Sequence, residues 1–126
     1  MKSNLRKIAA VLAFIIGAMA IFAGGQVMAG KIMDYYVIDW LPIYNVIAGV
    51  ISSFVTAILI WKGSKFGMPA AIATFASHSI VMLVLQIGYQ DVVAPDSIKA
   101  MTVRLVVWLI IQIMMTIQAK KDLDIT

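Results

Sequence analysis

Long apolar stretches alternate with short polar segments along the whole chain. Four of these stretches run from Ile8 to Ala29, Pro42 to Trp61, Pro69 to Gly88 and Ile98 to Gln118. Each is close to the roughly 20 residues that an α-helix needs to cross a hydrocarbon core of about 30 Å. Lipid offers backbone groups no hydrogen-bond partner, and the alternating pattern of a β-barrel is missing. We therefore expect an all-α integral membrane bundle of four transmembrane helices with short loops, formed by residues 1–126 as a single domain.

Residues that favour helix ends lie between these stretches. Pro42 and Pro69 fall near the first turns of the second and third stretches, where the missing N–H leaves no hydrogen bond unmade. The run from Pro95 to Ser97 supplies a proline and capping oxygens before the fourth stretch. Gly63 and Gly67 bracket a tight connection between the second and third. The pattern thus predicts where each helix begins.

The composition places the chain outside the range of soluble proteins. It is 63% hydrophobic and 13% charged, whereas soluble domains are roughly 45–50% apolar and about 25% charged. No cysteine is present, which excludes disulfides, thiolate metal ligands and cysteine nucleophiles. The formal charge of +4 comes from ten Lys and Arg against six Asp, most of them at the helix connections. We therefore interpret it as a signal of membrane topology and predict no nucleic-acid partner.

Positive and negative residues separate onto opposite sides of the predicted bundle. The connections on one side carry Lys2, Arg6, Lys7, Lys62, Lys65, Lys120 and Lys121. The other side has one lysine, Lys31, and the carboxylates Asp34, Asp39, Asp91 and Asp96. Aromatic residues mark both interfaces, with Tyr35, Tyr36, Trp40, Tyr44 and Tyr89 on the acidic side and Trp61 and Phe66 on the basic side. Because basic loops stay in the cytoplasm, both termini are predicted there, in a multi-pass protein of the inner (plasma) membrane of a prokaryote.

An alternative concerns the first apolar stretch. A basic start, an apolar run and the small-residue pattern from Val27 to Ala29 also fit a signal peptide that is cleaved before Gly30. The apolar run is longer than the usual 7–15 residues or so of such a peptide, which favours a membrane helix. Cleavage would leave a three-span protein.

Small residues on the first two spans predict how these helices pack. The first span repeats small residues at spacings of three and four, namely Ala9, Ala13, Gly17, Ala20 and Gly24. The second has a similar stripe of Asn45, Gly49, Ser52, Ser53 and Thr56. Small residues let membrane helices approach closely. We therefore assign Gly17, Gly24, Gly49 and Ser52 to helix packing, with the alternative that the polar stripe lines a cavity.

Arg104 is a cation within the fourth predicted span. It begins a polar face of that helix, which continues with Trp108 and Gln112 and should face protein instead of lipid. One interpretation is a structural ion pair, with Asp39 as the favoured partner. A second is that Arg104 reaches back to the interface, toward Asp96 or a lipid headgroup. A third is a role in binding substrate or in gating.

His78 is the only histidine, and it lies near the middle of the third span. A neutral imidazole is acceptable there if its nitrogens find partners, and Asn45, Ser52 and Gln112 are the expected ones. Proton transfer or ligand contact at His78 is the alternative. A haem is disfavoured because one histidine cannot supply both axial ligands, and the lack of clustered His and carboxylates argues against other metals. We predict no cofactor.

No arrangement of residues typical of a catalytic site is found, so we do not expect an enzyme. Ser77 and Ser79 adjoin His78 in sequence, but each points about 100° away from it on a helix. Two hypotheses follow. The protein acts by association in the lipid bilayer, as a homo-oligomer or as an accessory subunit of a membrane complex. Alternatively, it is a transporter, channel or proton-relay unit with a polar path around His78 and Arg104.

Overall fold

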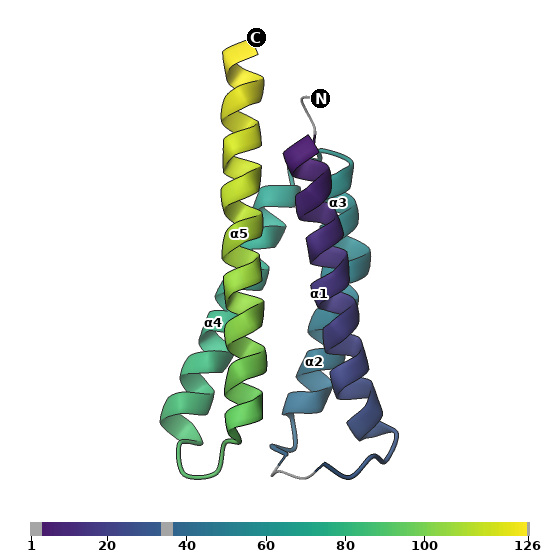
Figure 1. Cartoon of the computed structure of the whole chain (residues 1–126), viewed down its shortest axis with the longest axis vertical. Helices are drawn as coiled ribbons and strands as arrows, with labels where there is room; N and C mark the ends of the chain where they lie inside the picture. The colour runs from purple at the N-terminus through teal and green to yellow at the C-terminus, as the bar shows by residue number, and fades with distance from the viewer. Residues whose placement is uncertain (1–3, 34–36, 126) are drawn as a thin grey trace.

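The chain folds into four long antiparallel spans that form a bundle (Figure 1). This computed structural model describes the backbone of residues 4–33 and 37–125, and the side chains as far as Lys121. Helix α1 covers Asn4–Met28, and α4 and α5 cover Gly67–Gly88 and Pro95–Ile125. The second span consists of α2 (Leu41–Val50), the π-helix η1 (Ile51–Thr56) and α3 (Ala57–Trp61). We call the end of the bundle where α1 starts and α5 finishes the terminal end, and the other the distal end.

All four spans are long and apolar enough to cross a membrane. Many large apolar side chains on their outer faces are exposed, including Phe22 and Ile87, and a lipid environment accommodates them without penalty. The predicted all-α membrane bundle is therefore confirmed. The sequence-based assignments of Lys2, Asp34, Tyr35 and Tyr36 fall outside the described residues.

Two spans end in the same glycine-dependent turn. After α1, Gly30 has a positive φ of 108°, and the N–H of Lys31 bonds to the carbonyl of Gln26. After α3, Gly63 has a φ of 71°, and the N–H of Ser64 bonds to the carbonyl of Leu59. This is the Schellman motif, in which a residue without a side chain is favoured at the left-handed position. It stops each helix and satisfies the last carbonyl groups.

Helix α1 packs closely along the whole second span. Serine side chains join them directly, since Ser52 Oγ donates to the Ala13 carbonyl and Ser53 Oγ to the Phe14 carbonyl, both at 2.8 Å. Near them, Gly17 and Gly49 let the two backbones meet. The stripes of small residues on the first and second spans thus meet at the interface between these two spans. Both serines belong to η1, so the π-helix is part of this contact.

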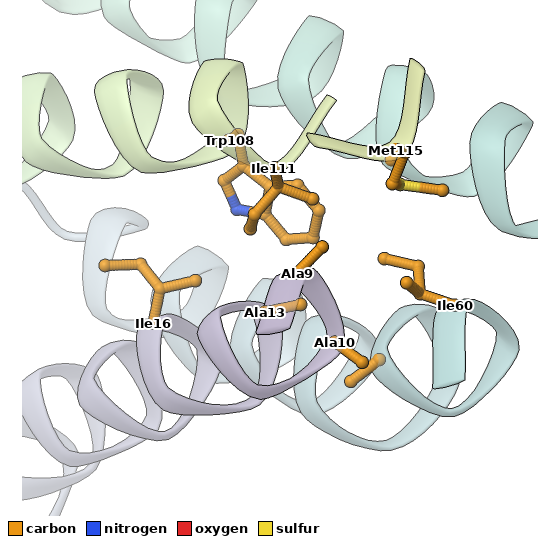
Figure 2. Packing of buried hydrophobic residues seen from close by; sticks show 10 residues of the cluster. Ala9, Ala10, Ala13, Ile16, Ile60, Trp108, Ile111 and Met115 are labelled. Atoms are coloured by element: carbon orange, nitrogen blue, oxygen red, sulfur yellow. The ribbon is translucent and has the colours of Figure 1, made fainter. Parts of the chain in front are cut away.

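The main core forms around Trp108 in the half of the bundle nearer the terminal end. Figure 2 shows the indole ring of Trp108 and the side chain of Ile111 above the small residues Ala9, Ala10 and Ala13 of α1. Alanines leave the space that the large ring fills, so the helices interlock without large gaps. Trp108 and Ile111 are completely buried.

A second core lies at the distal end. Buried Ile38, Leu41, Leu85 and Met101 form it, with several partly buried residues around them. Trp40 Nε1 donates a hydrogen bond to the Tyr89 hydroxyl at 3.0 Å, and the two rings meet edge to face. This contact connects the start of the second span to the end of α4.

Candidate functional site

Arg104 lies inside the bundle and has an unusual environment for a charged residue. Its side chain is only 6% exposed. One guanidinium nitrogen, Nη1, donates to the Asn45 side-chain oxygen at 2.6 Å and thereby links α5 to α2. A guanidinium carries five N–H donors, so one amide oxygen satisfies a small part of its capacity. The hydrogen bond orients Arg104 but does not neutralise its charge.

The expected ion pair with Asp39 is not formed. Asp39 is exposed, and within residues 4–33 and 37–121 no carboxylate lies in ion-pair contact with Arg104. Buried charges in proteins are normally paired, because an isolated one has lost its hydration without compensation. Asn45, which the sequence analysis grouped with the polar stripe of the second span, takes the place of the predicted carboxylate.

A small cavity reaches Arg104 from the distal end. Its volume is about 60 Å³, and residues of α1, α2 and the first turns of α5 line it. Four polar residues are part of its lining: Asn45 of α2, and Asp96, Ser97 and Arg104 of α5. The volume exceeds the roughly 10–15 Å³ that one water needs, so a few waters or a small ion fit beside the guanidinium.

A larger cavity, of about 230 Å³, opens at the terminal end. It lies among α1, the α3–α4 connection, α4 and α5, and the basic residues Arg6 and Lys65 line it together with Gln118 and Met115. Arg6 also contacts the second span, where its Nη2 donates to the Trp61 carbonyl at 3.4 Å. Cations therefore line both this cavity and the distal one.

A tightly packed layer separates the two cavities. Arg104 and His78 both border an interior gap next to Gly17, Gly49 and Ser52, and this gap has no room for a water molecule. Beyond it lies the core of Trp108 and Ile111 shown in Figure 2. In this structure the interior is closed between the two ends.

Three buried N–H donors have no hydrogen-bond partner among the described residues. They are Trp108 Nε1, Gln112 Nε2 and Arg6 Nε. Trp108 and Gln112 lie four and eight residues after Arg104 on α5. Residues four apart share a helix face, so Arg104, Trp108 and Gln112 lie one after another along one side of α5. Buried donors left unpaired are rare in proteins, and each is energetically unfavourable. The unpaired groups of Trp108, Gln112 and Arg6 are all N–H donors. Such donors can bind an anion or a carbonyl oxygen.

His78 forms a separate polar cluster with Tyr44 and Ser77. The Tyr44 hydroxyl lies 2.6 Å from His78 Nδ1 and 2.8 Å from Ser77 Oγ. The Tyr44 and His78 rings meet edge to face at 5.7 Å. His78 is 3% exposed. The histidine joins the third span to the second, but through Tyr44 and not through Asn45, Ser52 or Gln112.

Sequence reasoning missed Tyr44 as a site residue because it interpreted that side chain as an interfacial anchor. The available signal was its position inside the second span, one residue before Asn45. Among the candidates from the sequence, Arg104, Asn45 and His78 come together in the interior. Gln112 lies farther along α5, and Asp39 is on the surface.

Comparison with protein-family models, with curated proteins and with solved structures finds no match to this chain.

Proposed function

We propose that this membrane protein is a transport unit that binds a small anion at Arg104. The observation that carries the proposal is the burial of Arg104, a residue only 6% exposed, whose guanidinium contacts one neutral amide oxygen and no carboxylate among the described residues. An anion in the adjacent cavity would neutralise the charge and accept hydrogen bonds from the remaining N–H groups. A monatomic anion or a short carboxylate fits the 60 Å³ available.

The arrangement of donors along the bundle supports a route for such an anion. Arg104 borders the distal cavity, and Arg6 borders the terminal one. Between them, Trp108 and Gln112 present buried N–H groups without partners in the described part of the chain. Rings or lines of donors and cations are the usual means by which membrane proteins favour anions over cations.

The packed layer around Trp108 makes this a closed form of the proposed route. Passage requires the helices around Trp108 to separate, as in gated transport, where one part of a bundle rocks against another. Association with other membrane proteins, the other hypothesis from the sequence, remains a prediction.

Anion binding is testable by thermal unfolding of the purified protein in detergent. Chloride, nitrate and acetate, each compared with gluconate at equal sodium concentration, should raise the unfolding temperature in a saturable manner, because a ligand stabilises the state that binds it. Arg104→Gln should abolish the anion-specific increase. Lys99→Gln removes an exposed cation from the same helix and is the matched control.

The same variants test transport in liposomes that contain a halide-sensitive dye. We expect halide entry with the unmodified protein and with Lys99→Gln, and none with Arg104→Gln. Asp96→Asn should strengthen anion binding, since it removes a negative charge from the rim of the distal cavity. Equal anion responses in Arg104→Gln and Lys99→Gln would refute the proposal.

A further inference from the structure

Another cavity lies elsewhere, between the second span and α4. Its volume is about 300 Å³. Ile51 and Val55 of η1 form part of its wall and are 46% and 49% exposed, whereas His78 on the other side is almost completely buried. A wall of half-exposed apolar residues in a membrane helix faces lipid. The cavity therefore opens sideways into the bilayer. Its lining is mostly apolar, with Tyr44, Ser77 and His78 at one end and the hydroxyl groups of Thr56 and Thr74 elsewhere in the wall.

The polar end consists of Tyr44, Ser77 and His78, which all border the cavity. Their hydrogen bonds form a chain from Ser77 through the Tyr44 hydroxyl to His78 Nδ1. This chain can run in either direction, because hydroxyl groups both donate and accept and the imidazole has two tautomers. In one direction Ser77 keeps a free hydrogen, and in the other it keeps free lone pairs. Ser77 can thus donate a hydrogen bond to a ligand carbonyl or accept one from a ligand hydroxyl.

The depth of this cluster restricts the ligand. His78 is near the middle of the 22-residue helix α4, about 15 Å from each end of the helix. Phospholipid headgroups stay at the interface, and a charged group at this depth would be unfavourable. A neutral head with one or two oxygen atoms, attached to an apolar tail, can reach the bilayer centre from the side.

The π-helix η1 supplies this wall of the cavity. Ile51, Val55 and Thr56 belong to η1 and line the space opposite α4. A π-helical turn is rare and occurs frequently at functional sites, since it widens the helix and shifts side chains around its axis. Its position beside the polar cluster is a second observation that points to a binding site.

From these features we infer that the lateral cavity binds a neutral, bilayer-soluble lipid of the prenylated quinone type, with the head oxygens at Tyr44, Ser77 and His78 and the tail in the bilayer. A volume of 300 Å³ is at the lower limit of ligand pockets, about 300–1,000 Å³, and matches a ring-sized head with the tail outside. The inference concerns binding only, and it does not depend on the anion proposal.

The test uses the full chain in phospholipid nanodiscs and measures equilibrium binding of a quinone with a single isoprene unit. Ala73 is exposed and lines the cavity, so Ala73→Phe should obstruct its opening. Ala76→Phe adds the same ring at another exposed position of α4, outside the cavity, and is its matched control. We expect saturable binding that Ala73→Phe weakens at least tenfold and Ala76→Phe leaves unchanged.

Two further measurements examine the polar end. Tyr44→Phe should weaken quinone binding severalfold while the protein still inserts into nanodiscs. A hydrocarbon analogue with the same ring and tail but no oxygens should not compete. Absence of saturable binding, equal effects of the two alanine variants, or competition by the hydrocarbon analogue would each overturn the inference.

Discussion

Gly17 of α1 and Gly49 of α2 face each other so closely that neither position has room for a side chain. A Cβ atom on Gly17 would lie 2.7 Å from the Gly49 carbonyl oxygen, and it would also collide with Ser53. In a membrane, where burial of apolar surface between helices contributes little, such close backbone contact is a main source of packing energy. The pair therefore fixes the distance between the first two spans.

Gly17→Leu should consequently destabilise the bundle. The added side chain meets backbone and the short Ser52 and Ser53 side chains, which cannot move away, so the helices must separate. Overpacking of this kind typically costs about 1–3 kcal/mol. Unfolding in mixed micelles should shift to lower denaturant concentration by a corresponding amount.

The control for this prediction is Gly25→Leu. Gly25 is on the same helix, and a Cβ atom there would meet nothing within 4 Å. Stability should change little or rise slightly, because leucine has a higher helix propensity than glycine. Equal losses in both variants would show that the contact between α1 and α2 is not the cause.

The membrane bundle was predictable because it depends on patterns that are local in sequence. Apolar stretches of sufficient length specified four spans, and Gly63 marked the turn after α3. The π-helix was not predictable in this way. Its residues, Ile51 to Thr56, are apolar or small like the rest of the span, and its geometry arises where Ser52 and Ser53 bond to carbonyls of α1. That contact joins residues distant in sequence.

The orientation of the bundle is a prediction that cysteine labelling can test. The chain has no cysteine, so a single one can be introduced without background. Ser64→Cys places it in the α3–α4 connection and Gln90→Cys in the α4–α5 connection, and both keep every charge that sets the topology. In intact cells a membrane-impermeant maleimide should label Gln90→Cys and leave Ser64→Cys unmodified. Permeabilised cells should label both, and the reverse pattern in intact cells would contradict the predicted cytoplasmic termini.

The partners of buried polar residues were harder to predict than the residues themselves. The lone cation and lone histidine stood out against an apolar background, which made Arg104 and His78 candidates. Their partners depend on how the helices rotate about their axes and cross. Charge favoured Asp39 for Arg104, but the observed partner is the neutral Asn45, and a tyrosine expected at the interface bonds to His78.

Tyr44→Phe should destabilise the protein more than Tyr89→Phe does. Loss of the Tyr44 hydroxyl leaves His78 Nδ1 and Ser77 Oγ without the group that joins them, deep between the helices. An unpaired buried polar group typically costs about 1–3 kcal/mol. Tyr89 accepts a single bond from Trp40 at the distal end. Thermal unfolding of the two variants gives the comparison, and equal losses would show that the Tyr44 hydroxyl contributes no more to stability than the Tyr89 hydroxyl does.

Asn45→Asp should place a permanent carboxylate beside Arg104 and so replace the anion that we propose to bind there. The substitution changes the side chain little in shape and places a carboxylate oxygen where the amide oxygen now lies, 2.6 Å from Arg104 Nη1. The guanidinium already makes the bond to Asn45 charge-assisted, and the carboxylate adds the Coulomb attraction of an ion pair. The variant should therefore unfold at a higher temperature than the unmodified protein in gluconate. Chloride should then add no further stability, because the guanidinium is already neutralised. Asn45→Ala, which removes the partner without adding charge, should instead lower the stability and keep the response to chloride. If chloride stabilised Asn45→Asp as much as it stabilises the unmodified protein, the chloride would bind somewhere other than Arg104.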